Sequence, residues 1–95
     1  MTPQEVCAKL ADKYESGEWQ WIQGTAFIGD TCCCVLGGMS ILTTDRGDYR
    51  DTKYFFMDVL GIPSIAVWND HPNRTPQEVL AALRKVSKDD TPTSI

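Results

Sequence analysis

The chain lacks the sequence features that mark a membrane protein or a nucleic-acid-binding protein. No apolar run approaches the about 20 residues that a membrane span requires. The nine Lys and Arg residues are scattered along the chain, whereas nucleic-acid binding needs a concentrated positive surface. Asp and Glu number 13, so the formal net charge is −4. We therefore expect no membrane and no direct nucleic-acid partner, and we expect a protein partner instead.

Histidine is scarce, and the cysteines do not follow the spacing of metal or redox motifs. His71 is the single histidine, and the four cysteines include no Cys-x-x-Cys pattern. The chain has no basic start followed by an apolar stretch, so we expect a cytoplasmic protein with reduced thiols. These observations predict no metal site, no cofactor and no disulfide framework.

A repeated phrase, Thr-Pro-Gln-Glu-Val, marks the start of two predicted helices. The phrase begins at Thr2 and again at Thr75, and it places Thr at the N-cap, Pro at the first position and Glu at the third. Apolar residues at helical spacing follow both copies. These two segments predict helices over residues 3–16 and 76–87. Two further helical patterns predict a helix from Asp30 or Thr31 to residue 42 and a helix over residues 48–60, which gives four helices in all.

The other segments have less regular patterns. Residues 18–29 fit a loop or a short hairpin, residues 64–68 fit one helical turn or an extended piece, and residues 43–47 fit an exposed polar loop. Residues 89–95 form a polar tail that we expect to be flexible. The chain is thus predicted to be a mainly α protein. We expect one compact domain over residues 1–88, with about four helices around a buried central helix rich in Cys and Gly.

Three consecutive cysteines, Cys32, Cys33 and Cys34, lie at the start of the predicted central helix. Adjacent helical residues point about 100° apart, so three in a row cannot converge on one ion. We favour a buried role, with cysteine acting as a small apolar residue and with Gly37 and Gly38 allowing a neighbour to approach closely. On this interpretation Cys34→Ser leaves an unpaired buried hydroxyl and destabilises more than Cys34→Ala, and Gly37→Leu destabilises most.

An enzymatic alternative uses the same cysteines. A helix N-terminus favours the thiolate, and a thiolate beside a histidine is a nucleophile. The alternative function is therefore a thiol-dependent enzyme using Cys34 or Cys33 with His71. We expect a chain without enzymatic activity, because no third residue is clearly placed to orient His71.

The candidate binding residues are aromatic and charged side chains of two segments. Trp and Arg are enriched in interface hot spots, which favours a binding role for five residues: Trp68, Asp70, Arg74, Trp19 and Trp21. A structural role is the alternative for the loop after residue 68. In that interpretation Arg74 pairs with Asp70 across the turn, and Trp68 closes the core. Exposure of Tyr49 or Tyr54 would also mark a partner site.

Several of these residues resemble the motifs of a small domain family of unknown function that occurs in actinobacteria and phages. The resemblance covers residues 18–86 and rests on three segments in the same order: Trp21-Ile22-Gln23-Gly24, Cys34-Val35-Leu36-Gly37-Gly38, and Trp68-Asn69-Asp70 with Arg74-Thr75. Among the cysteines, only Cys34 matches a family cysteine, and the family pattern specifies no residue at His71.

The resemblance implies no known activity, but it makes a phage origin plausible. We therefore expect a small acidic protein–protein interaction module, such as a phage-encoded inhibitor of a host protein or of a defence system such as a CRISPR complex. Self-association is a third hypothesis, and the sequence does not give the oligomeric state.

Overall fold

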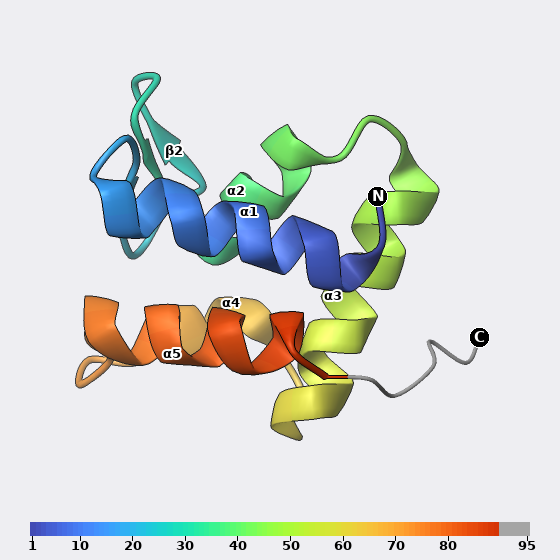
Figure 1. Ribbon diagram of the computed structural model, residues 1–95. Helices are drawn as coiled ribbons and strands as arrows, with labels where there is room; N and C mark the ends of the chain where they lie inside the picture. The colour runs from blue at the N-terminus through green and yellow to red at the C-terminus, as the bar shows by residue number, and fades with distance from the viewer. Residues whose placement is uncertain (90–95) are drawn as a thin grey trace.

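The computed structural model describes residues 1–89 and is mainly helical (Figure 1). The described chain contains five helices and three short strands, in the order α1 (Pro3–Ser16), β1 (Gln20–Trp21), β2 (Phe27–Ile28), β3 (Cys32–Cys33), α2 (Val35–Leu42), α3 (Arg46–Leu60), α4 (Ile65–Asn69) and α5 (Pro76–Ser87). In Figure 1, α1 and α5 lie side by side in front, α2 and α4 lie behind them, and α3 crosses one end. The prediction of a single, mainly α domain is confirmed. The predicted tail lies outside the described residues, apart from Asp89.

Both copies of the repeated phrase form the predicted capping boxes. The Thr2 hydroxyl accepts a hydrogen bond from the Glu5 N–H at 3.1 Å, and the Glu5 carboxylate accepts one from the Thr2 N–H at 2.8 Å. Thr75 and Glu78 repeat the arrangement at 3.2 and 3.1 Å. Each box satisfies two backbone donors that a helix start leaves unpaired. The two helices then run in opposite directions along each other (Figure 1).

The central helix begins later than the sequence predicts. Cys32 and Cys33 form strand β3, and α2 begins at Val35 with Cys34 as its N-cap. Strand β3 is the middle strand of a three-stranded sheet, parallel to β1 and antiparallel to β2. Of the two alternatives for residues 18–29, a loop or a short hairpin, the hairpin is not formed within the segment, because β1 and β2 both pair with β3. These contacts join distant parts of the chain, and they override the local helical preference.

Two other boundaries differ in detail from the prediction. Helix α3 begins at Arg46, because the Asp45 carboxylate accepts a hydrogen bond from the Asp48 N–H at 2.8 Å and so caps the helix. Of the two alternatives for residues 64–68, the helical one is confirmed, with Ser64 capping α4. No helix within residues 1–89 is both long enough and apolar enough to cross a membrane.

Helix α2 packs closely against its neighbours through two glycines. A Cβ on Gly37 would lie 2.4 Å from the Ala26 carbonyl oxygen, and a Cβ on Gly38 would lie 2.4 Å from Leu10 Cδ1. Both approaches are shorter than any normal contact, so the thin helix predicted from the glycines is confirmed. The core around it is formed by Val6, Cys7, Leu10, Ala11, Val35, Met39, Phe55, Phe56, Ile65, Val79, Leu83 and Val86.

Candidate functional site

Asn69, the last residue of α4, is buried and uses its whole side-chain amide. Its Oδ1 accepts hydrogen bonds from Trp21 Nε1 at 2.7 Å and from the Val35 N–H at 3.1 Å. Its Nδ2 donates to the Ile22 carbonyl at 3.1 Å and to Asp70 Oδ1 at 3.0 Å. Because a buried amide is stable only when its groups are paired, these bonds tie α4 to β1 and to the first turn of α2.

A second set of bonds joins the segment after β1 to the loop after α4. Gln23 Nε2 donates to the carbonyls of Asn69 at 3.0 Å and of His71 at 2.8 Å. The Gly24 N–H donates to Asp70 Oδ1 at 2.9 Å. This backbone bond, followed by the bond from Asn69, lowers the pKa of the Asp70 carboxyl below its ordinary value, because both bonds favour the charged form. Asp70 is thus exposed, but its carboxylate already accepts two hydrogen bonds within the chain.

Trp68 and Arg74 form a stacked pair at the start of α5. The Trp68 ring is half-buried and packs edge-on against Phe56, with 5.4 Å between ring centroids. The Arg74 guanidinium lies 4.4 Å from the centre of the Trp68 ring, and Arg74 Nε donates to the Trp68 carbonyl at 2.9 Å. Arg74 also pairs with Glu78 at 3.3 Å. The predicted Arg74–Asp70 pair is therefore wrong, because each residue has a nearer partner.

Three separate sequence motifs thus meet in one hydrogen-bonded unit. A family model described as a family of unknown function, DUF6197, matches residues 2–89. The chain belongs to this family. No curated protein and no solved structure matches the chain. In this DUF6197 domain, five residues of the motifs make contacts that stabilise the fold: Trp21, Gln23, Asn69, Asp70 and Arg74.

The cysteines of this DUF6197 domain are free thiols, and the Tyr14 hydroxyl lies 3.7 Å from Cys33 Sγ. Burial raises the pKa of the Cys7 thiol to about 12, and burial also raises the pKa of the Cys33 thiol. The Tyr14 hydroxyl donates to the Cys33 carbonyl at 2.8 Å. His71 is exposed, and its Nδ1 accepts a hydrogen bond from the Asn73 N–H at 3.1 Å. Within residues 1–89 no hydrogen bond joins His71 to a cysteine, so the geometry offers the thiol-enzyme hypothesis no support.

The described chain also contains no metal-binding cluster. Within residues 1–89, no three His, Cys, Asp or Glu side chains lie close enough together to hold a metal ion. Cys34 serves instead as an N-cap, because its Sγ accepts a hydrogen bond from the Gly37 N–H at 3.4 Å. The position that matches the motif cysteine therefore has a structural role at the start of α2.

The burial of the thiols predicts a clear order of reactivity. Cys7 and Cys33 should be alkylated slowly at neutral pH, because the thiolate is the reacting form and a raised pKa keeps it scarce. For Cys7 the rate should rise with pH until the pH approaches about 12. Cys32 is only half-buried and should react first. Mass spectrometry after brief treatment with iodoacetamide measures the order, and fast labelling of Cys7 in the folded chain would contradict it.

The N-cap bond reverses the expected ranking of the Cys34 variants. A serine hydroxyl at this position would accept the Gly37 N–H, and serine is a favoured N-cap, so Cys34→Ser should change the free energy of unfolding by less than about 0.5 kcal/mol. Cys34→Ala removes the acceptor and should cost about 1 kcal/mol. Urea unfolding of both variants measures the order. A serine variant less stable than the alanine variant would show that the cap contributes nothing.

Trp21, one of the predicted binding residues, lies in β1, and Trp19 directly precedes this strand. Both are half-buried and line a hollow of about 460 Å³ between the end of α1 and the start of α5, together with Tyr14 and Leu80. Lys13 Nζ lies 5.3 Å from the Trp19 ring. The Trp21 indole nitrogen already donates to Asn69. The structure thus joins Trp21 to the Trp68 loop through Asn69, and the binding role of Trp19 and Trp21 stays a prediction.

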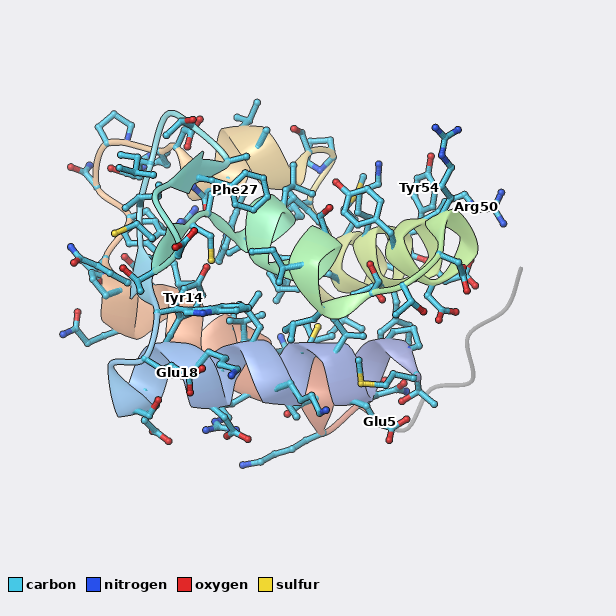
Figure 2. All side chains as sticks on the ribbon, turned by 90° about the horizontal axis from the view of Figure 1, so that it is seen from above. Glu5, Tyr14, Glu18, Phe27, Arg50 and Tyr54 are labelled. Carbon is cyan, nitrogen blue, oxygen red and sulfur yellow. The ribbon has the colours of Figure 1, made fainter. Side chains whose placement is uncertain are left out.

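The large apolar side chains that are most exposed lie elsewhere. Apart from Met1, they belong to β2, α2, α3 and α4, and they are here called the apolar face: Phe27, Ile28, Ile41, Tyr54 and Val67. Figure 2 shows the labelled Phe27 and Tyr54 on the side of the molecule away from α1. Of the aromatic residues whose exposure the sequence left open, Tyr54 is exposed, and the tryptophans are all half-buried.

Part of the apolar face surrounds a second hollow. The Phe27 ring lies over Gly37, and Ile41 follows Gly37 by one turn on α2, so the two side chains share one side of the helix. Beside them is a hollow of about 370 Å³, whose lining includes Trp19 and Cys32. Sequence reasoning missed Phe27, Ile28 and Ile41. The one available signal was the position of Phe27-Ile28 between two glycines, which is typical of a short exposed strand.

Proposed function

We propose that this chain is a protein–protein interaction module and that its partner docks on the apolar face. The observation that carries the proposal is the exposure of Phe27 and Ile41, which are 45% and 49% exposed beside one hollow. Ile28, the neighbour of Phe27 in β2, is 59% exposed. Soluble proteins rarely leave grouped large apolar side chains in water unless another molecule covers them. Burying such side chains also supplies most of the favourable energy of a protein interface.

Within this proposal, the specific role is inhibition of a host protein by a phage-encoded chain. This role follows from the resemblance to phage domains and from the small size and net charge of −4. An inhibitor acts by covering a functional surface of its target, so it needs a rigid docking face rather than a reaction centre. The bonds around Asn69 supply rigidity, because they join β1, α2 and α4.

The test compares charge substitutions on two sides of the molecule. The partner is first identified by mass spectrometry after capture from a host lysate, and its affinity for the purified chain is then measured by calorimetry. The double variant Ile28→Asp/Ile41→Asp should bind about tenfold or more weakly, because a buried charge without a partner opposes docking. Ala81→Asp is the matched control, because Ala81 is exposed on α5.

The outcome is decided by which variant loses affinity. Unchanged binding of the double variant would overturn the proposed docking face, as would loss of binding by Ala81→Asp alone. Circular dichroism and thermal unfolding of each variant must match those of the parent chain. A self-associating chain would instead form oligomers that the double variant disrupts, and light scattering detects this result.

A further inference from the structure

The outward face of α3 carries a row of cationic side chains. Arg46, Arg50 and Lys53 follow the spacing i, i+4, i+7, which places them on one side of a helix. The opposite side of α3 is buried through Thr52, Phe55 and Phe56. Tyr54 adjoins the row and is 55% exposed. Figure 2 shows Arg50 and Tyr54 together at the edge of the molecule, on the same side as Phe27.

The three cations of this row have no strong carboxylate partner within residues 1–89. Arg50 Nε lies 3.8 Å from Asp51 Oδ1, a long and exposed contact, and Arg46 has no ion pair in the described chain. Lys53 Nζ lies 5.1 Å from the centre of the Tyr49 ring and 5.8 Å from that of Tyr54. The positive charge of the row is therefore left to interact with another molecule.

Other arginines in the chain are neutralised at shorter range. Arg84 contacts Asp12 at 2.8 Å and Glu15 at 2.9 Å, and Arg74 contacts Glu78 at 3.3 Å. The chain as a whole has a net charge of −4, so a helix face with three weakly paired cations departs from the average. A partner that binds at this helix face is expected to carry negative charge, because interfaces match opposite potentials.

We infer that the α3 row of Arg46, Arg50, Lys53 and Tyr54 docks an acidic segment of the partner protein. The inference rests on the proposed function and adds the charge of the partner. Arginine binds carboxylates through two parallel N–H bonds, and the neighbouring Tyr54 ring offers apolar contact area beside them. Arginine and tyrosine are also among the residues most enriched in interface hot spots.

A protein segment fits the row better than a nucleic acid does. A phosphate backbone would extend along the whole molecule and meet its net negative charge, with Asp51 and Asp58 on the same helix. A short acidic peptide spans only the row, where Asp51, 3.8 Å from Arg50 Nε, is a weak competitor because exposed ion pairs contribute little. The interaction is electrostatic, so it should weaken when salt shortens the screening length from about 10 Å at 0.1 M to about 3 Å at 1 M.

The test titrates the full isotope-labelled chain with a soluble probe peptide of repeated Asp-Glu-Leu triplets and follows the backbone NMR signals. Signals of α3 should shift, and the shifts should diminish as salt is added. The charge reversal Arg46→Glu/Arg50→Glu should weaken peptide binding about tenfold or more, in line with the loss of close charge pairs at interfaces. Lys85→Glu/Lys88→Glu makes the same charge change on exposed residues of α5 and its C-cap, and should leave peptide binding nearly unchanged.

Three outcomes would overturn the inference. Equal loss in the two double variants would show that only net charge matters. An absence of shifts in α3 would show that the row does not bind carboxylates, and equal or tighter binding of a single-stranded thymidine oligonucleotide would assign the row to phosphate. Failure of the proposed function is distinguishable, because it depends on Ile28 and Ile41 and on the natural partner rather than on the probe peptide.

Discussion

Asn69→Ala should lower the free energy of unfolding by about 3–5 kcal/mol. The substitution removes the acceptor of Trp21 Nε1 and of the buried Val35 N–H, and it removes the donor to the Ile22 carbonyl. Each buried polar group left without a partner costs about 1–3 kcal/mol. Because small domains have only about 5–15 kcal/mol of stability, the variant should be partly unfolded near body temperature. Urea unfolding followed by circular dichroism measures the loss.

Asn73→Ala is the matched control for Asn69→Ala. Asn73 is exposed, and its contact with His71 is made by the backbone N–H, which alanine keeps. The control should therefore change the free energy of unfolding by no more than about 0.5 kcal/mol. If Asn69→Ala came within about 1 kcal/mol of this control, the hydrogen bonds around Asn69 would not be holding the three motifs together.

Gly37→Ala should destabilise the chain by about 2–3 kcal/mol, although alanine is the better helix former by about 1 kcal/mol. The added Cβ would lie 2.4 Å from the Ala26 carbonyl oxygen, which belongs to the backbone leading into β2. That carbonyl also accepts the Cys34 N–H at 3.0 Å, so the strand cannot move away without breaking the bond at the start of α2. Thermal and urea unfolding measure the loss.

Gly38→Ala should be milder than Gly37→Ala. The atom nearest to its Cβ is Leu10 Cδ1, the far end of a side chain that can rotate, and the gain in helix propensity offsets part of the repacking. The substitution at Gly37 should also displace Phe27, and so it should reduce partner binding as well as stability. Equal stabilities of the two variants would contradict the close approach of β2 to α2.

The sequence predicted the helices well where the signals are local. The two capping boxes, at Thr2 and Thr75, set the starts of α1 and α5 through contacts within four residues, and propensity and side-chain chemistry are sufficient there. The start of α2 could not be predicted in this way. Cys33 pairs with Trp21 and with Phe27, and no local pattern reveals contacts across that distance.

The candidate site was predictable only in part, because burial depends on tertiary packing. The sequence identified the Trp68-Asn69-Asp70 loop, but it suggested that Arg74 pairs with Asp70. In the structure Arg74 pairs with Glu78, and Asp70 accepts a hydrogen bond from the Gly24 N–H. Aromatic composition alone favoured the tryptophans as exposed residues. The structure half-buries them and exposes Phe27, Ile28 and Ile41 instead. Two of these lie on the short edge strand β2, which has a neighbouring strand on one side only.

Site-specific photo-crosslinking tests the docking of a partner on the apolar face most directly. A photo-reactive amino acid replaces Ile28 in one chain and Ala81 in another, and each chain is irradiated in the lysate of the cells in which it acts. The account predicts one protein adduct from the chain labelled at residue 28 and none from the chain labelled at residue 81. An adduct from position 81 alone, or no adduct from either position, would contradict the proposed interaction face.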